Sequence, residues 1–373
     1  MTVIRVVARD IREHDAVGRF ALHTARRLNE LGARAVCYAE NTVFPDSLVR
    51  PIQRLAVDLA PQDQILFHFS TFDPVLEEIL SYPLRKHCYV HNITDPAYFR
   101  EWNPSEYENV LLGYGQFRLL SGFDSLAANS MFTADVVKEH VPSESKTGIA
   151  LVPPIPDIRS WKNMTSQQPA INLNPAEPLL LFVGRRAPNK NISRLLKVVA
   201  LLQERQPQFN LAFVGRPVVE AYEEDIRSTI ASSGSAKQKW HVFNEVSDAE
   251  LRWLYERAYA FVTFSTHEGF CIPVADAFYF DLPVYGYAQP AVSELCVRAG
   301  GNYRLTRQED DGLVARDLDA FLERHAEIER KPFISNVPQR VEEYCNGNRV
   351  DRWLSGIISC GKNSRLAGMD LDI

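Results

Sequence analysis

Short apolar runs alternate with amphipathic segments along the first half of the chain. Short, mainly apolar runs predict buried strands at 3–7, 35–39, 64–69, 87–90, 125–128 and 148–152. Apolar residues at helical spacing predict helices at 18–32, 74–80, 110–120 and 133–140, the first of them ending at Gly32. Because strands and helices alternate, we expect a mostly parallel sheet with helices on both faces.

The same alternation begins again in the second half. Strands are predicted at 179–183, 211–215, 240–243, 259–264 and 282–287. Helices are predicted to begin near 192, 248 and 272, and to cover 317–328 and 337–358. Ser247 and Glu250 have the spacing of a capping box at the helix that begins near 248. Residues 290–294 are interpreted as a polar turn before a further helix.

The segment between the two halves has the composition of a linker. Residues 153–178 hold six prolines among polar residues. At 373 residues the chain is also too long for one typical core and fits two domains. We predict an N-terminal domain at 1–165 and a C-terminal domain at 166–345. A last helix and a frayed tail follow at 346–373, and this segment can return to the N-terminal domain.

Composition and charge narrow the classes of function. With 46% hydrophobic and 24% charged residues the chain is typical of a soluble globular protein, and its net charge of −6 argues against a general nucleic-acid binder. The N-terminus is charged too early for a signal peptide, and no apolar run approaches about 18 residues. The six cysteines lack any metal-site spacing, so we expect reduced thiols in the cytoplasm and no metal.

The stretch from Ser265 to Phe278 carries the first candidate chemistry. It holds two carboxylates, Glu268 directly before Gly269 and Asp276 after a further seven residues. The free N–H groups in the first turn of the helix that begins near 272 suit a phosphate or a ligand rich in hydroxyls. The alternative is an ordinary strand, turn and helix whose acids cap the helix.

A second candidate is the glycine turn that begins with Gly184, Arg185 and Arg186 and ends at Lys190, before another predicted helix. Two guanidinium groups and an ammonium beside a glycine turn are groups that bind a diphosphate. The alternative is a solvated basic loop, because arginine and lysine are common on surfaces.

Two further candidates, Gly18 and His91, follow predicted strands of the first half. Open parallel sheets bind ligands at such places, although a histidine there is more often structural and hydrogen-bonded to backbone. Gly113 and Gly115 could suggest a dinucleotide site. Arg118 occupies the third glycine position and no strand leads in, so we reject that interpretation.

Taken together, these motifs resemble those of glycosyltransferase family 4, the retaining enzymes with the two-domain GT-B fold, and in particular bacterial polysaccharide mannosyltransferases. The resemblance is carried by residues 182–191, by 265–278 with an E-x7-E-like pattern and by 289–294, with support from 16–20, 91–94 and 127–133. It covers nearly the whole chain in the expected order. It implies an α/β fold in which two Rossmann-like domains, an N-terminal acceptor domain and a C-terminal donor domain, have parallel sheets facing across a cleft.

The resemblance also implies roles for individual residues. Arg185 and Lys190 would hold the diphosphate of a nucleotide-sugar donor, and Glu268 would hold the transferred sugar. His91 would lie against the sugar, and Asp276 would take the place of the acid that contacts the ribose. The implied catalytic residues are His91, Arg185, Lys190 and Glu268, and the implied donor-binding residues are Gly18, Gly184, Gly269, Phe270, Cys271, Ile272, Asp276 and Glu294.

Two positions depart from the pattern of the family. Asp276 stands where the family usually has glutamate, so its carboxylate reaches one methylene less far. Cys271 stands where the family usually has a second glycine and adds a side chain beside the sugar. Both departures bear on which donor the protein uses.

The function implied by the resemblance is metal-independent, retaining transfer of a hexose, mannose or a related sugar. The donor would be GDP- or UDP-linked, the acceptor a saccharide or lipid-linked oligosaccharide, and no other cofactor is expected. Two alternatives stay open: a catalytically weak nucleotide-sugar-binding protein, and a nucleotide-sugar epimerase on the same fold. A lipid-linked acceptor would place a cytoplasmic protein at the inner face of the membrane, where Arg19, Arg26 and Arg27 could form a basic patch.

Overall fold

The computed structural model describes residues 2–12, 15–42, 47–142, 148–155, 161, 164–174, 176–329, 336–345 and 347–360. These residues form two compact units. The first unit comprises the described residues of 1–96, 105–155 and 345–373, and the second comprises those of 97–104 and 156–344. The division after Ile155 lies ten residues before the boundary expected at 165. The tail predicted at 361–373 lies outside the described residues.

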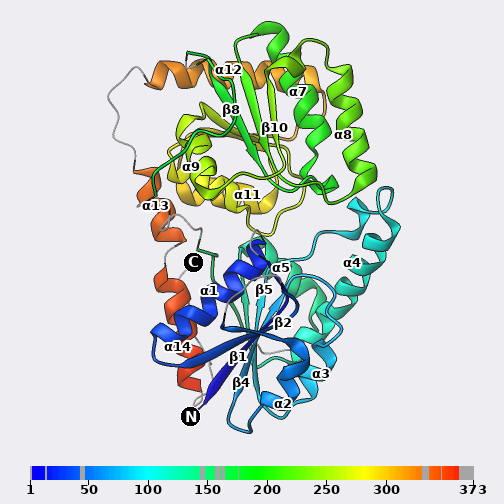
Figure 1. The fold of residues 1–373 in the computed structure, drawn as a ribbon, viewed down its shortest axis with the longest axis vertical. Coiled ribbons are helices and arrows are strands. Elements are labelled where there is room, and N and C mark those ends of the chain that lie inside the picture. The colour runs from blue at the N-terminus through cyan, green and yellow to red at the C-terminus, as the bar shows by residue number, and fades with distance from the viewer. Residues whose placement is uncertain are drawn as a thin grey trace. The chain divides into compact units, whose positions relative to one another are not determined.

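The first unit is built on a parallel sheet (Figure 1). The strand order of this sheet is β3-β2-β1-β4-β5-β6-β7. Its strands are β1 (Val3–Ile11), β2 (Arg34–Thr42), β3 (Val49–Pro51), β4 (Gln64–Phe69), β5 (Arg85–Val90), β6 (Ser125–Ala128) and β7 (Ile149–Leu151). Its helices are α1 (Ala16–Glu30), α2 (Leu55–Asp58), α3 (Leu76–Ser81), α4 (Pro104–Gln116), α5 (Met131–His140) and α14 (Gly347–Cys360). The strand order reverses between β1 and β4, which is where doubly wound sheets bind ligands.

The second unit repeats this plan with the strand order β10-β9-β8-β11-β12-β13, again all parallel. Its strands are β8 (Leu179–Val183), β9 (Asn210–Val214), β10 (Trp240–Phe243), β11 (Ala260–Thr263), β12 (Val284–Tyr287) and β13 (Tyr303–Thr306). Its helices are α7 (Ile192–Arg205), α8 (Glu220–Ser232), α9 (Asp248–Arg257), α10 (Ile272–Tyr279), α11 (Pro290–Ala299), α12 (Asp311–Glu329) and α13 (Val337–Tyr344). Here the order reverses between β8 and β11.

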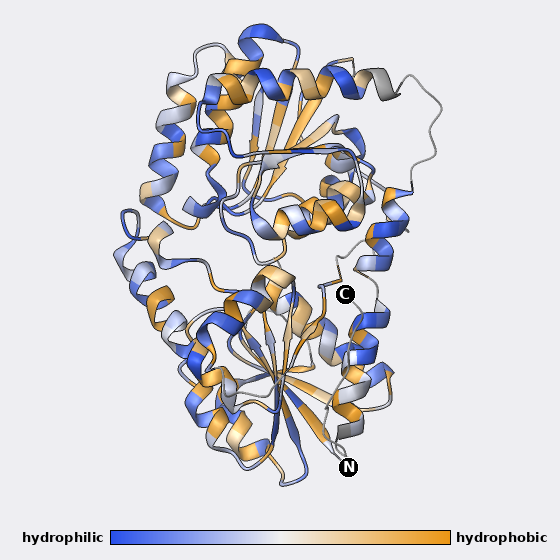
Figure 2. Ribbon diagram, turned by 180° about the vertical axis from the view of Figure 1, so that it is seen from behind, coloured by the Kyte–Doolittle hydropathy of each residue, from blue (hydrophilic) through white to orange (hydrophobic). Residues whose placement is uncertain are grey.

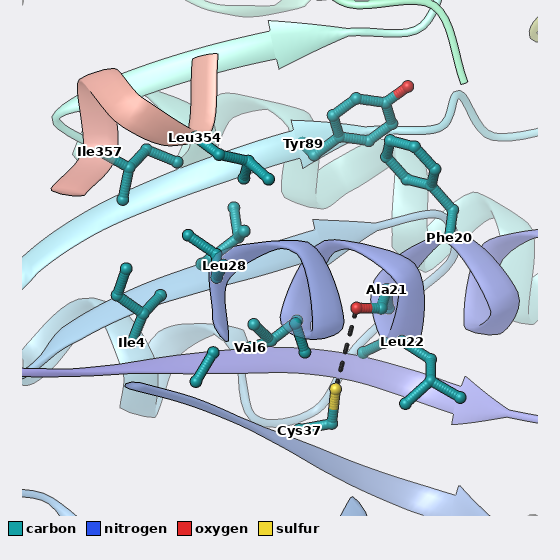
Figure 3. Close-up of a cluster of buried hydrophobic side chains, with 14 of the residues drawn as sticks. Ile4, Val6, Phe20, Ala21, Leu22, Leu28, Cys37, Tyr89, Leu354 and Ile357 are labelled. Carbon is teal, nitrogen blue, oxygen red and sulfur yellow. Dashed lines mark hydrogen bonds between the residues drawn. The ribbon is translucent and has the colours of Figure 1, made fainter. Parts of the chain in front are cut away.

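The inner strands of both sheets are apolar and buried, as sheets covered on both faces require (Figure 2). In the first unit, Leu28 of α1 and Val6 of β1 belong to one buried cluster (Figure 3). Leu354 of α14 belongs to the same cluster, and Asp351 of that helix forms an ion pair with Arg27 at 2.6 Å. The last described helix therefore completes the core of the first unit.

The single helix predicted at 337–358 is wrong. The chain forms two helices there, α13 ending at Tyr344 and α14 beginning at Gly347. Gly347, the first residue of α14, is a poor helix former. The separation lets α13 belong to the second unit and α14 to the first.

The polar turn predicted at 290–294 is also wrong, because these residues are the first turns of α11. Pro290 is the first residue of the helix, where a missing N–H costs nothing. The side chain of Gln289 caps this end by accepting a hydrogen bond from the Val292 N–H. A proline preceded by a capping side chain is therefore a helix start here.

Candidate functional site

Two loops of the second unit meet where its strand order reverses. The first follows β8 and leads into α7, and the second follows β11 and leads into α10. β8 and β11 are paired neighbours, with Leu181 opposite Phe261. Because the carboxyl ends of parallel strands lie at one edge of a sheet, this pairing brings the two candidate motifs together.

Lys190 and Glu268 form an ion pair between these two loops. Lys190 Nζ lies 2.5 Å from Glu268 Oε1, and the two side chains are 15% and 10% exposed. The loops are also joined directly: Asn189 Nδ2 donates to the His267 carbonyl oxygen at 3.0 Å, and the Thr266 N–H donates to the Asn189 carbonyl oxygen at 2.8 Å. The structure thus brings the predicted ammonium and the predicted carboxylate into contact.

The two arginines of the first loop have different environments. Arg185 is exposed. Arg186 is buried, forms an ion pair with Glu223 of α8 at 2.7 Å, and donates from Nη2 to Asn244 Oδ1 at 2.6 Å. Its guanidinium therefore anchors the loop to the rest of the unit. The interpretation of both guanidinium groups as diphosphate ligands is wrong for Arg186, which leaves Arg185 and Lys190 as the candidates.

Gly184 lies where the ends of β8 and β9 approach closely. A Cβ on Gly215, just after β9, would lie 1.8 Å from the Gly184 carbonyl oxygen. No side chain fits at that distance, so the two strand ends can approach this closely only if residue 215 is glycine. A Cβ on Gly184 itself would lie 3.1 Å from the ring of Phe182. The glycine turn predicted at Gly184 therefore depends on a second glycine, Gly215, which follows β9.

The residues after Glu268 turn the chain sharply into α10. Gly269 is half-buried, and Phe270 stacks on Tyr344 of α13 with ring centroids 6.2 Å apart. Cys271 is the N-cap of the helix, and Ile272 is its first residue. The N–H groups of the first turn of α10 thus follow the Glu268 carboxylate within a few residues.

Cys271 has a backbone conformation that favours glycine. Its φ is 73°, in the left-handed region, and its side chain is buried. Burial raises the pKa of its thiol well above the usual range, and the neighbouring Glu268 carboxylate raises it further. The thiol is therefore held in its protonated form. Cysteine at a position with this φ strains the backbone, whereas glycine would not.

We expect Cys271→Val to be less stable than Cys271→Gly by about 1–2 kcal/mol, although valine removes less buried volume. A β-branched side chain is strained at positive φ, whereas glycine adopts this conformation freely. Urea unfolding of the two variants measures the difference. An equal or larger loss of stability for Cys271→Gly would contradict the assignment of strain to this residue.

Asp276 lies in the second turn of α10 and is 6% exposed. Burial raises the pKa of Tyr255 well above its usual range, and the nearby charge of Asp276 is the next largest cause. The Tyr255 hydroxyl donates to the Pro273 carbonyl oxygen at 3.3 Å. The short acid thus lies close to a buried phenol of α9, and its contact with a ribose stays a prediction.

α11 adds two polar side chains to this region. Gln289 Nε2 donates to the Glu268 carbonyl oxygen at 3.0 Å, while its Oε1 caps α11. This buried amide was not among the predicted site residues, and the glutamine-proline pair at a helix start was the available signal. Glu294 Oε1 accepts a hydrogen bond from the Tyr344 hydroxyl at 2.8 Å. Gln289 therefore supports the Glu268 loop, and Glu294 links α11 to α13.

The two candidates of the first unit lie after β1 and β5. Gly18 is in the first turn of α1, where its N–H donates to Asp15 Oδ2 at 2.8 Å. A Cβ on Gly18 would lie 2.7 Å from Ile11 Cα, so the residue also has a packing role. His91 directly follows β5, and its Nε2 lies 3.0 Å from Nδ1 of His68, a histidine that was not predicted.

Three further observations concern the described part of the chain: its possible metal ligands, its helices and the expected basic patch. Its histidine, cysteine and acidic side chains do not gather in groups of three as a metal site requires. None of its helices is both long enough and apolar enough to cross a bilayer. In the expected basic patch, Arg27 forms ion pairs with Glu30 and Asp351, both at 2.6 Å, so two carboxylates balance its charge.

Comparison with known proteins finds similarity in the second unit to one family of glycosyl transferases. Residues 163–340 match the model of the glycosyl transferases group 1. A GDP-mannose:cellobiosyl-diphosphopolyprenol alpha-mannosyltransferase from Xanthomonas oryzae is 34% identical over 98 residues, 26% of this chain and 25% of the relative. An O-antigen chain mannosyltransferase B from Escherichia coli is 30% identical over 105 residues, 28% of this chain and 27% of the relative. The matched region thus spans about a quarter of each of these relatives.

Solved structures extend the similarity to the whole chain. A sucrose-phosphate synthase from Thermosynechococcus elongatus superposes with a TM-score of 0.69 over 96% of this chain and 99% of that chain, at 14% identity. WaaG, a glycosyltransferase involved in lipopolysaccharide biosynthesis, superposes with a TM-score of 0.67 over 97% of this chain and 100% of that chain, at 13% identity. Residues 163–340 therefore match the model of the glycosyl transferases group 1, and the chain as a whole has the α/β GT-B fold of two Rossmann-like units.

Proposed function

We propose that the protein transfers a hexose from a nucleotide-diphosphate sugar to a saccharide or lipid-linked oligosaccharide, with retention of configuration and without a metal ion. The observation that carries the proposal is the Lys190–Glu268 ion pair between loops that follow adjacent strands. The match of residues 163–340 to the group 1 glycosyl transferases supports the reaction class.

Lys190 and Glu268 would each bind a different part of the donor. The Lys190 ammonium can exchange the Glu268 carboxylate for the diphosphate of the donor, which leaves Glu268 to accept hydrogen bonds from sugar hydroxyls. Arg185, exposed on the same loop, adds a second cation. Charge-assisted hydrogen bonds of this kind contribute about 1.5–3 kcal/mol each.

These cations would act most strongly as the reaction proceeds. The bond between the sugar C1 and the phosphate oxygen breaks, and negative charge develops on the leaving diphosphate. Fixed cations lower the energy of that charge more than the energy of the bound substrate. In a front-face substitution, the acceptor oxygen bonds to C1 on the side that the phosphate leaves. The acceptor's proton then passes to a phosphate oxygen, and the configuration is retained.

The names of the relatives favour one donor and one acceptor class. Both named relatives are mannosyltransferases, and the name of the Xanthomonas oryzae protein specifies GDP-mannose and a lipid diphosphate-linked saccharide. We therefore infer mannose, or a closely related sugar, as the transferred group and GDP as its carrier, with UDP as the alternative. A lipid-linked acceptor would bring the protein to a membrane surface.

Binding of nucleotides tests the donor site first. GDP, UDP, ADP and TDP are compared in a thermal-shift assay, with GMP and UMP as controls that lack the second phosphate. We expect one diphosphate to raise the melting temperature, since a ligand at a hundredfold excess over its Kd stabilises by about 2.7 kcal/mol. Transfer from the matching sugar donor to a panel of saccharide acceptors follows, with the anomeric configuration read by NMR. Absence of any diphosphate-specific shift would contradict the donor site, and an inverted product would contradict retention.

A nucleotide-sugar-binding protein with little transferase activity is the second candidate. The strained Cys271 and the buried, shortened acid Asp276 favour it, because both stand beside the proposed sugar and ribose sites. Tight diphosphate binding without transfer to any acceptor of the panel would support this candidate over the transferase.

A further inference from the structure

A pair of histidines lies at the carboxyl ends of β4 and β5. His68 is 1% exposed and His91 is half-buried, with His68 Nδ1 and His91 Nε2 3.0 Å apart. Burial lowers the pKa of His68 to about 3. Burial, with a smaller contribution from His68, also lowers the pKa of His91 well below its usual value. Both rings are therefore neutral near pH 7, and each carries one proton on one of its two nitrogens.

The Thr24 hydroxyl determines where those protons are. Thr24 Oγ1 lies 2.8 Å from the Ala21 carbonyl oxygen and 3.2 Å from His68 Nε2. Two oxygens at 2.8 Å repel each other unless a hydrogen lies between them, so the single hydroxyl hydrogen points to Ala21. The hydrogen between Thr24 and His68 must then belong to His68 Nε2.

The proton on His68 Nε2 determines the tautomer of His91. With its hydrogen on Nε2, neutral His68 has a lone pair on Nδ1 and can only accept there. His91 must therefore donate from Nε2, which leaves a lone pair on His91 Nδ1. None of the hydrogen bonds found among the described residues uses that nitrogen.

We propose that His68 is a positioning residue, which holds His91 in the Nε2–H tautomer so that His91 Nδ1 accepts a hydrogen bond from a hydroxyl of a saccharide substrate. This assignment rests on the proposed function, because it takes a saccharide as the ligand. In this tautomer His91 Nδ1 cannot donate a hydrogen bond to the substrate. The bound hydroxyl must therefore direct its own hydrogen toward Nδ1.

The surroundings hold the His91 backbone and ring in place. Its N–H donates to the Phe69 carbonyl oxygen at 2.8 Å, and its carbonyl oxygen accepts from Asn129 Nδ2 at 2.9 Å. Tyr89 packs against the ring at 4.7 Å.

The other titratable groups around the pair leave its tautomers unchanged. The Tyr89 hydroxyl is committed to the Val152 carbonyl oxygen, and His23 of α1 stacks on Phe20, whose ring meets His91 edge-on at 5.8 Å. Neither group contributes to the pKa shift of His68 or of His91.

Nitrogen NMR on the ¹⁵N-histidine-labelled full chain tests the tautomer without any substrate. We expect a pyridine-type Nδ1 and a pyrrole-type Nε2 for His91, identified by its loss in His91→Gln. His68→Phe keeps the ring but removes the acceptor, so the His91 tautomers should mix. His68→Asn places an amide oxygen near the former Nδ1, so the signature should be retained. A pyrrole-type Nδ1 on His91 in the parent protein would overturn the proposal.

Sugar transfer supplies the second readout. We expect His68→Phe to lower kcat about three- to tenfold, and His68→Asn to stay within about twofold of the parent. The thermal shift produced by the nucleotide should not change in either variant. His87→Phe removes another buried strand histidine and serves as the matched control, with unchanged kcat and His91 signature. Equal kcat in His68→Phe and His68→Asn would overturn the positioning role. If the parent protein transfers no sugar, the proposed function fails, and the tautomer experiment still decides the assignment of the histidine pair.

Discussion

Lys190→Ala is expected to lower kcat/KM for sugar transfer by at least about a hundredfold, while both units stay folded. Lys190 Nζ is fixed against Glu268 before any donor binds, and the side chain is only 15% exposed. A cation held in this way stabilises the leaving diphosphate without a reorganisation step. Water that fills the space in the variant cannot replace a fixed positive charge. Steady-state transfer with the donor that gives the thermal shift measures the loss, and circular dichroism checks the fold.

The alanine variant also leaves Glu268 without its cation, so stability and catalysis must be separated. Lys190→Glu combined with Glu268→Lys restores an ion pair between the loops but places a carboxylate where the diphosphate would bind. We expect this double variant to be more stable than Lys190→Ala and equally inactive. Lys197→Ala removes an exposed lysine from the following helix and should retain the parent activity. More than about a tenth of the parent activity in Lys190→Ala would show that the ammonium is not part of the catalytic machinery.

The inner strands could be predicted from the sequence because a strand buried on both faces is a continuous apolar run. The inner strands β4, β6 and β8 begin and end at the predicted residues. The edge strands β3 and β13 are short and partly exposed, so their sequences lack that signal. α8 was missed for a related reason, since most of its residues are charged or small and only a few reach the core.

The candidate site, like the fold, could be predicted only in part from the sequence. Each motif of the Lys190–Glu268 pair is contiguous in the sequence, and the resemblance implies that both belong to one donor site. Arg185 and Arg186 are equivalent in the sequence, and only the position of Glu223 on the unpredicted α8 separates an exposed arginine from a buried one. His68 lies inside an apolar run, so its contact with His91 depends on strand pairing that no local pattern contains.

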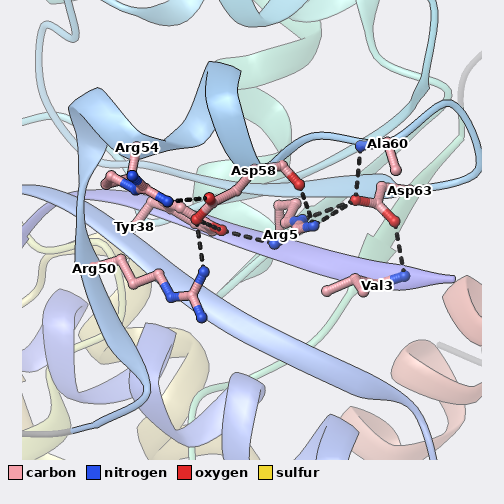
Figure 4. Close-up of polar contacts among 8 residues, drawn as sticks. All are labelled: Val3, Arg5, Tyr38, Arg50, Arg54, Asp58, Ala60 and Asp63. Carbon is pink, nitrogen blue, oxygen red and sulfur yellow. Dashed lines mark hydrogen bonds and ion pairs between the residues drawn. The ribbon is translucent and has the colours of Figure 1, made fainter. Parts of the chain in front are cut away.

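Asp63→Ala is expected to destabilise the first unit by about 3–5 kcal/mol. The Asp63 side chain is fully buried and accepts from Arg5 Nη2 at 2.7 Å and from Arg5 Nε at 2.9 Å (Figure 4). It also accepts from the backbone N–H groups of Val3 at 3.0 Å and Ala60 at 3.1 Å. Arg5 would keep its bond to the Tyr38 hydroxyl but lose its counter-charge at 9% side-chain exposure. Leaving the buried Arg5 charge without its partner lowers the free energy of unfolding more than any other single substitution in this network.

Urea unfolding should show this loss in one transition only, because the two units have separate cores and need not unfold together. The transition of the first unit should move to lower urea, while that of the second unit and the GDP-induced thermal shift stay unchanged. Asp63→Asn keeps the shape but turns an amide group toward Arg5, so it should lose less than alanine yet more than about 1 kcal/mol. Asp135→Ala breaks an exposed pair with Lys138, both side chains being 59% exposed, and should cost less than about 1 kcal/mol. An equal loss of stability in Asp63→Ala and Asp135→Ala would contradict this prediction. It would mean that water reaches the Arg5 guanidinium in the folded protein, near the start of β1.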